Sequence, residues 1–309
     1  ATSGNITDSG ALAITGTTTF TVADGQSVIL NESSTFSTVI FASAGTIASV
    51  EINDSNALDL GALTTTGNLT VTAGGNITDS GTVTVGGNLA ATTDASNGAI
   101  DLGTLAVDGT MALTTHGTGA AIVVNDAGLN FAASTVGGAL SATATTGNII
   151  DAGALTITGT STFVTIANDA TITLDQGGHA FTGALLITTN DTSTDTAGDV
   201  TISAGSSAAL DFGNSTIDGD LIATSSNATG ITDSGAMTVR GTSSFQTTAA
   251  NADISLGTST LGDGTGTDTI TLNTTGSTGN ATLDNGTTAV ALGTSADSLV
   301  TSVGGNLTL

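Results

Sequence analysis

Cysteine, proline, tryptophan and tyrosine are all missing from this chain of 309 residues, and each absence excludes a class of structure. The chain has no cysteine, which rules out disulfide bonds and thiolate metal sites. It has no proline, so every residue of a strand keeps a backbone N–H to donate to a neighbouring strand. It has no tryptophan or tyrosine, the side chains expected on the flat platforms that bind sugars. A lectin is therefore disfavoured, whereas adhesion to proteins stays open.

Positive charge is almost as scarce as these four residue types. Arg240 is the single Lys or Arg, against 26 Asp and Glu, and the formal net charge is −25. Nucleic-acid phosphates and anionic membranes would both repel such a chain, so we expect no nucleic-acid partner. No run approaches the ~18 apolar residues of a membrane span, and we find no signal peptide. We therefore expect no membrane insertion.

The spacing of the apolar residues argues against intrinsic disorder. Low aromatic content (3%) and high net charge are typical of disordered chains. However, only 9% of the residues are charged, and the mean hydropathy is +0.32. The apolar residues also alternate, as at Leu58 and Leu60 or at Val83 and Val85, and each pair ends at glycine. Period-two alternation predicts short strands with one buried face.

Two repeats organise these strands. The triplet Gly-Asn-Leu at 67–69 returns at 87–89, 20 residues further on, and three short strands fit between the copies. That is the length of one coil of a β-solenoid. A longer repeat places a Gly-Asn-Ile-Thr-Asp-Ser-Gly motif or a close variant at intervals of 71, 72 and 82 residues. Its aspartates are Asp8, Asp79, Asp151 and Asp233.

The sequence thus predicts an all-β fold: a right-handed parallel β-helix (β-solenoid) of about 20 residues per coil, with irregular loop insertions. We expect one continuous solenoid over residues 1–309, of about 15 coils, that is part of a longer or polymeric protein. Asparagines of the Gly-Asn turns, such as Asn68 and Asn88, are expected to form amide ladders along the axis. Residues 188–200 and 257–268 are expected to protrude as loops.

Residues 67–89, GNLTVTAGGNITDSGTVTVGGNL, resemble the haemagglutinin-type repeats of filamentous haemagglutinin and related large bacterial exoproteins. The resemblance implies a right-handed parallel β-helix in a secreted adhesin, haemolysin or fibre-forming stalk. It also implies an extracellular or cell-surface location. We take from it the fold class and this location, and no functional residue.

No constellation of side chains indicates an enzyme. The repeating aspartates invite a catalytic role, but a catalytic residue is normally unique, and Asp-Ser-Gly is a common turn sequence. Their only basic partner would be Arg240 or one of two histidines. His116 and His179 each lie next to glycine and are interpreted as surface-turn residues rather than metal ligands. We expect no catalytic residue and no organic cofactor.

Calcium is the one candidate ligand. Residues 264–270 fit the core of the calcium-binding nonapeptide repeat, which makes Asp263 and Asp268 candidate metal ligands. A net charge of −25 also exceeds one uncompensated charge per layer of ~4.8 Å, well inside the ~8 Å screening length. Ca²⁺ that bridges exposed carboxylates would relieve this repulsion.

These features favour a non-enzymatic structural role. We expect an extracellular rod, fibre or stalk segment that assembles with itself, head to tail or laterally. The alternative is an adhesin module whose loops 188–200 and 257–268 bind a host or neighbouring cell surface.

Overall fold

The computed structural model describes residues 1–190, 192, 197–263, 268–288, 290–292 and 298–309. They divide into two compact units, Ala1–Thr145 (unit 1) and Thr146–Leu309 (unit 2), and each is considered by itself. The fold is all-β: parallel stacked strands form a β-solenoid of about 12 turns with about 21 residues per turn, and the described residues contain no helix. The predicted fold class and coil length are confirmed. One continuous solenoid over residues 1–309 stays a prediction.

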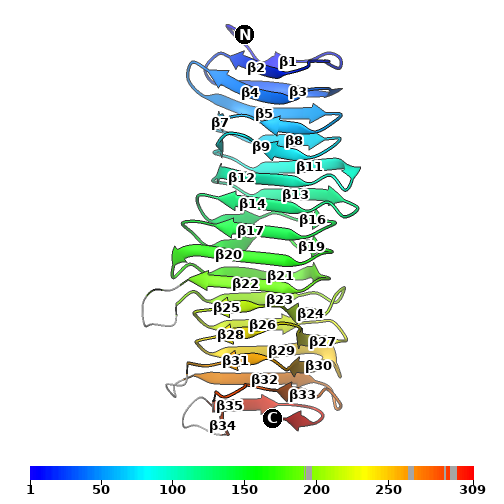
Figure 1. Ribbon diagram of the computed structural model, residues 1–309, viewed down its shortest axis with the longest axis vertical. Helices are drawn as coiled ribbons and strands as arrows, with labels where there is room; N and C mark the ends of the chain where they lie inside the picture. The colour runs from blue at the N-terminus through cyan, green and yellow to red at the C-terminus, as the bar shows by residue number, and fades with distance from the viewer. Residues whose placement is uncertain (191, 193–196, 264–267, 289, 293–297) are drawn as a thin grey trace. The chain divides into compact units, whose positions relative to one another are not determined.

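Unit 1 contains the first 17 strands of the described chain (Figure 1). They are β1 (Ile6–Thr7), β2 (Thr17–Val22), β3 (Gln26–Ser34), β4 (Thr38–Ser43), β5 (Ile47–Asp54), β6 (Leu58–Leu60), β7 (Leu63–Thr65), β8 (Leu69–Ala73), β9 (Ile77–Asp79), β10 (Val83–Val85), β11 (Leu89–Ser96), β12 (Ile100–Val107), β13 (Met111–His116), β14 (Ala121–Asn125), β15 (Leu129–Phe131), β16 (Ser134–Val136) and β17 (Leu140–Ala144).

Unit 2 contains the remaining strands of the described chain (Figure 1). They are β18 (Ile149–Asp151), β19 (Leu155–Ile157), β20 (Ser161–Asn168), β21 (Ile172–Phe181), β22 (Leu185–Asn190), β23 (Val200–Ala204), β24 (Leu210–Phe212), β25 (Ser215–Ile217), β26 (Leu221–Ser225), β27 (Gly230–Asp233), β28 (Met237–Val239), β29 (Ser243–Ala250), β30 (Asp253–Leu256), β31 (Ser259–Leu261), β32 (Thr269–Thr275), β33 (Ala281–Leu283), β34 (Ala291–Leu292), β35 (Ser298–Ser302) and β36 (Leu307–Thr308).

Each strand pairs in parallel with the equivalent strands of the turns before and after it. In unit 1, Leu69 of β8 is paired with Leu89 of β11, as the 20-residue repeat predicts. In unit 2, Ile172 of β21 is paired with Val200 of β23, which lies 28 residues further along the chain. Such wide turns use up residues, so the chain forms fewer turns than the 15 predicted from a uniform coil.

The core of each unit is a narrow channel filled by alternate residues of the strands. Leu58 and Leu60 of β6 are buried on either side of half-buried Asp59. Apolar side chains thus stack on those of the neighbouring turns, which removes them from water without any second layer of structure. The outward faces are mostly polar or small.

Different turns fill one core position differently. In β11 of unit 1 the inward residues are Leu89 and Ala91, whereas in β29 of unit 2 they are Ser243 and Phe245. Both pairs are fully buried, and one large and one small side chain fill the space in each case. The small residue of unit 2 carries a cost, because the hydroxyl of Ser243 has no hydrogen-bond partner.

The corners bring backbones of successive turns too close for side chains. A Cβ atom at Gly74 would collide with the carbonyl oxygen of Ser55 in the previous turn. The Gly-Asn corners add a polar link: Asn68 Oδ1 accepts the backbone N–H of Asn88 at 2.9 Å, and Asn88 Oδ1 accepts that of Thr110 at 2.9 Å. These asparagines therefore link successive turns as expected, but their side-chain amides bind the backbone of the next turn, so the predicted amide-to-amide ladder does not form at these positions.

Candidate functional site

The four repeating aspartates, here called the corner aspartates, lie at or next to the ends of strands β1, β9, β18 and β27. Asp79 shows their role most fully. Its carboxylate accepts the backbone N–H groups of Gly103 and Thr104 at 3.0 and 2.8 Å, and the Thr104 hydroxyl at 2.7 Å. These donors lie at the corner of β12, in the next turn. The carboxylate therefore replaces the strand-to-strand hydrogen bonds that the corner interrupts.

Asp233 forms the same contacts in unit 2. It accepts the backbone N–H groups of Gly257 and Thr258 at 2.6 and 3.0 Å, and the Ser259 hydroxyl at 2.9 Å. Asp8 accepts the N–H of Glu32 at 3.2 Å. The structure thus places these aspartates as corner residues whose hydrogen bonds join one turn to the next.

The threonine and serine that flank two corner aspartates bind backwards, to the turn before. Thr78 and Ser80 donate their hydroxyls to Asp59 at 3.3 and 2.7 Å. In unit 2, Thr232 and Ser234 donate to Asp211 in the same way, at 2.8 and 2.6 Å. One Thr-Asp-Ser motif therefore links three successive turns. The sequence showed that the motif recurs but not which residues it contacts.

The third corner aspartate, Asp151, has a different partner. His179 Nε2 lies 3.1 Å from Asp151 Oδ2, and both side chains are fully buried. Burial lowers the pKa of His179, outweighing the nearby carboxylates of Asp151 and Asp175, which raise it. The interpretation of His179 as a surface-turn residue is wrong, because the imidazole occupies a core position beside Phe181. His116 is exposed at the end of β13.

The candidate calcium ligands lie close together at a corner that is only partly described. Asp263 is exposed, Asp268 is buried, and the Asp263 N–H donates to Asp268 Oδ2 at 3.1 Å. Residues 264–267, which complete the predicted motif, lie outside the described residues. Among the residues that are described, no three histidine, aspartate or glutamate side chains come together as a metal site would require. Calcium binding stays a prediction.

The predicted protruding loops overlap with strands. Residues 188–190 belong to β22 and Val200 begins β23, whereas 191 and 193–196 lie outside the described residues. In the second loop, 259–261 form β31, whose Ser259 and Leu261 are buried and which pairs with β28. The expectation that all of 257–268 protrudes is therefore wrong, because the Ser-Thr-Leu segment alternates like any other strand.

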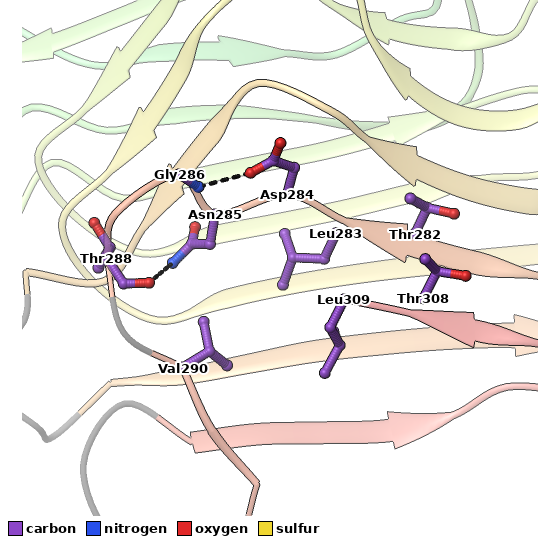
Figure 2. A pocket seen from close by; sticks show the side chains of 9 residues that line it. All are labelled: Thr282, Leu283, Asp284, Asn285, Gly286, Thr288, Val290, Thr308 and Leu309. Atoms are coloured by element: carbon purple, nitrogen blue, oxygen red, sulfur yellow. Dashed lines mark hydrogen bonds between the residues drawn. The ribbon is translucent and has the colours of Figure 1, made fainter.

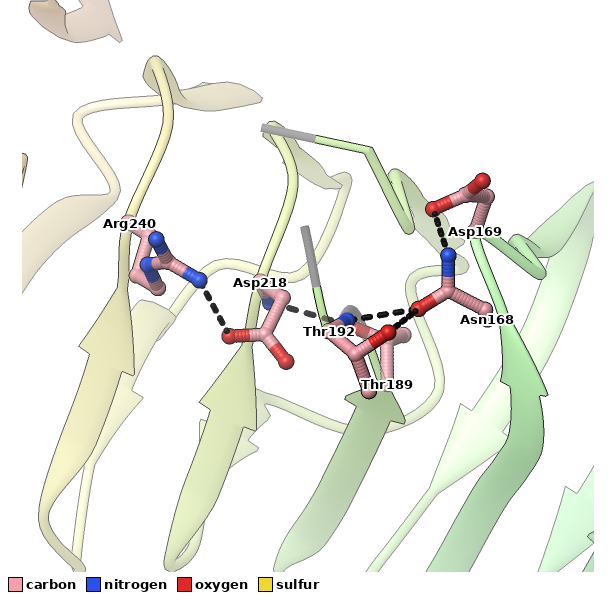
Figure 3. Close-up of polar contacts among 6 residues, drawn as sticks. All are labelled: Asn168, Asp169, Thr189, Thr192, Asp218 and Arg240. Atoms are coloured by element: carbon pink, nitrogen blue, oxygen red, sulfur yellow. Dashed lines mark hydrogen bonds and ion pairs between the residues drawn. The ribbon is translucent and has the colours of Figure 1, made fainter. Parts of the chain in front are cut away.

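The only cation of the sequence lies near the first of these segments (Figure 3). Arg240 Nη1 is 3.4 Å from Asp218 Oδ1, and the backbone N–H of Asp218 donates to the Thr189 hydroxyl at 3.0 Å. Nearby, Asn168 Oδ1 accepts the Thr192 hydroxyl at 2.9 Å. These contacts again connect successive turns, and the Arg240 side chain is 35% exposed.

A pocket opens at the last described turns of unit 2 (Figure 2). Asn285 anchors its wall, because the amide accepts the Leu261 N–H at 2.7 Å and donates to the Leu261 carbonyl at 3.1 Å. Asp284 is the one ionisable side chain among the described residues of the lining. The lining comprises Thr282, Leu283, Asp284, Asn285, Gly286, Thr288, Val290, Thr308 and Leu309.

Comparison with models of known families assigns the chain to a protein family. A family model described as repeats of unknown function (DUF5649) matches residues 1–43, 47–102, 118–188 and 197–260. The chain belongs to the DUF5649 repeat family. Each of the four matched segments contains one corner aspartate, so the DUF5649 match follows the long repeat.

The other comparisons give no functional information. Neither the curated proteins nor the solved structures contain a match to the chain. The comparisons support repeats in a β-solenoid and do not identify the chain as filamentous haemagglutinin-like. Within the described part of the chain, no helix has the length and apolar character to cross a membrane.

Proposed function

We propose that this DUF5649 protein is a structural segment of an extracellular fibre or stalk at the cell surface, and that it has no enzymatic activity. The corner aspartates carry this proposal. In every copy the carboxylate is hydrogen-bonded to the backbone of the next turn, as in Asp79 with Gly103 and Thr104. A carboxylate engaged in this way resists separation of turns and is a poor general acid or base for a bound substrate.

The polar surface supports the same role. The acidic charge of −25 keeps neighbouring molecules apart laterally, while backbone ladders carry load from turn to turn within each unit. Association with further copies of the chain is part of the proposal, and stacking of strand edges is its simplest form. Calcium, if bound, would act by bridging carboxylates rather than in catalysis.

Single-molecule stretching tests the mechanical role. Because a turn contains about 21 residues, its release should lengthen the chain by about 70 Å. We expect a series of such steps at forces that fall when Asp79 and Asp233 are replaced by alanine. A single low-force event with no effect of either substitution would contradict the proposal.

Shortening the first predicted loop distinguishes an adhesin from a structural stalk. Residues 191–196 are replaced by a short Gly-Ser linker, which leaves strands β22 and β23 intact. A stalk keeps its stretching behaviour and its location on the cell, as judged by electron microscopy of immunolabelled cells. If the variant stays at the surface but loses attachment to other cells, the adhesin role is correct.

A further inference from the structure

The third corner aspartate differs from its three counterparts in what binds it. Asp151 accepts the backbone N–H groups of Asp175 and Gln176 at 3.0 and 3.3 Å, so the backbone part of the contact is retained. In the second and fourth copies a threonine hydroxyl, from Thr104 or Thr258, completes the contact. In the third copy a titratable imidazole, His179, stands beside the carboxylate instead. This corner alone among the four can respond to pH through its donor.

The hydrogen bonds fix the protonation of the imidazole. The backbone N–H of Leu155 donates to His179 Nδ1 at 2.9 Å, so this nitrogen carries no proton. The proton of the neutral ring therefore lies on Nε2, which is 3.1 Å from Asp151 Oδ2 but not aligned for a good hydrogen bond. A second proton on the ring must go to Nδ1, where it would face the Leu155 N–H donor.

The surroundings of the ring make that second proton costly. The ring of Phe181 stacks on it, with centroids 5.5 Å apart and planes inclined by 17°. The acidic groups near the imidazole are Asp151 of β18 and Asp175 of its own strand, whereas its register partner in β23 is Ala204. The His179 carbonyl also accepts the Gly205 N–H at 2.7 Å, so movement of this residue disturbs the next turn.

We propose that His179 and Asp151 form an acid-sensitive contact that keeps the corner of β21 packed while the imidazole is neutral and releases it when Nδ1 is protonated. The Leu155 amide then loses its acceptor, and the β21 corner separates from β18 and β19. This inference does not depend on the structural role proposed above, because it concerns the stability of one corner.

The sign of the pH effect follows from the pKa of His179, which burial lowers in the folded protein. An unfolded histidine takes up its proton near pH 6.5. Between that pH and the lower folded pKa, the unfolded chain binds more protons than the folded one. The stabilising contribution is therefore complete above about pH 6.5 and declines as the pH falls below it.

Hydrogen exchange of single amides, followed by NMR on the whole chain, tests the proposal. The probe is the Leu155 amide, and the reference is the Leu221 amide of the same unit, which donates to the Thr242 carbonyl. After correction for intrinsic exchange rates, protection of Leu155 relative to Leu221 should fall between pH 7.5 and pH 5. The fall should be up to about tenfold for each unit by which the pKa is lowered. An unchanged ratio overturns the proposal.

Two matched variants separate titration from packing. In His179→Asn the side-chain oxygen can still accept the Leu155 N–H but cannot gain a proton, so the ratio should no longer depend on pH. In His116→Asn, which removes the exposed histidine, the wild-type pH dependence should remain. Loss of the dependence in the second variant, or its persistence in the first, contradicts the proposal. If His179→Asn does not fold, the wild-type ratio decides alone.

Discussion

Asp54 in unit 1 and His179 in unit 2 are both ionisable side chains in the core, and burial acts on them in opposite directions. Burial raises the pKa of Asp54 and lowers that of His179, because it disfavours the charged form of each. Acidification therefore relieves the buried charge in unit 1, whereas it introduces one in unit 2. The comparison shows that one fold can carry corners with opposite responses to pH.

Asp54 occupies a position that asparagine fills elsewhere. Its carboxylate accepts the Phe36 N–H at 3.2 Å but has no proton to donate when ionised, and the Phe36 carbonyl accepts a hydrogen bond from Asn56 Nδ2 at 3.3 Å instead. Asn125 both accepts the Val107 N–H at 2.8 Å and donates to the Val107 carbonyl at 3.0 Å. Asn285 binds Leu261 in the same two-fold manner. The neutral amide satisfies two backbone groups without placing a charge in the core.

The largest effect is expected in the core, at the position that β11 of unit 1 and β29 of unit 2 fill differently. Phe245→Ala should destabilise unit 2 by about 3–5 kcal/mol, because it leaves a cavity beside the small Ser243. Ser243→Leu alone should also destabilise, by overpacking against Phe245. The double variant reproduces the Leu89 and Ala91 arrangement of unit 1 and should recover most of the loss.

Hydrogen exchange of peptides that contain β29 measures the stability of this region for the four proteins of the cycle. If the double variant loses as much stability as the two single variants together, the Leu–Ala and Ser–Phe pairs are not interchangeable at this core position.

The next largest effect concerns the corner aspartates themselves. Asp233→Ala leaves the N–H groups of Gly257 and Thr258 without their acceptor and should cost about 2–3 kcal/mol. Asp79→Ala should cost a similar amount in unit 1, because it accepts the equivalent donors. Exchange of the four donor amides measures each loss, and Asp108→Ala, on an exposed residue, is the control. No difference from Asp108→Ala would contradict the structural role of these residues.

A smaller effect is expected when the charge in unit 1 is removed. Asp54→Asn should stabilise unit 1 by about 1 kcal/mol at pH 7, because its amide can make both bonds that Asn125 makes. The gain should shrink on acidification. Because the pKa of Asp54 is raised in the folded protein, folded Asp54 binds a proton at a pH where the unfolded chain does not, and this stabilises the wild-type protein relative to the variant.

The reverse substitution, Asn125→Asp, provides the matched control for this gain. It should destabilise unit 1 at pH 7 and less so at pH 4. Urea denaturation of each variant at both pH values gives the result, and a gain for Asp54→Asn that does not vary with pH would refute the assigned cause.

The smallest effect is expected at the exposed ion pair of unit 2. Arg240→Gln should change stability by at most about 0.5 kcal/mol, because Arg240 and Asp218 remain in contact with water. Thermal denaturation in 0.05 and 0.5 M NaCl checks this value. A loss above 1 kcal/mol would contradict the description of this contact as a weak, water-exposed ion pair.

Much of the fold could be predicted from the alternation and short-range repetition of apolar residues. Alternation placed Leu58 and Leu60 in the core, and the Gly-Asn-Leu repeat paired Leu69 with Leu89, because strand direction and coil length are set by neighbouring residues. The family match to DUF5649 repeats agrees with this long repeat.

The contacts of the corners could not be predicted in the same way. The partner of a corner aspartate lies in the next turn, and its position depends on every insertion between them. His179 reaches Asp151 because Gly177 and Gly178 lengthen the corner of β21, whereas the threonine of the other copies needs no such insertion. Because the sequence does not show which turn this corner contacts, the two glycines before His179 indicated a surface turn.

The reach of the corner aspartates also limits how such a chain can change in length. Asp79 and Asp233 each bind donors that lie a fixed 24 and 25 residues ahead. A single inserted residue within a strand would turn the following apolar side chains towards water and carry the donors out of register. Duplication or loss of a complete turn leaves every such distance intact. Relatives of this protein should therefore differ in size by multiples of one turn, with single-residue changes confined to segments outside the stretch between a corner aspartate and its donors.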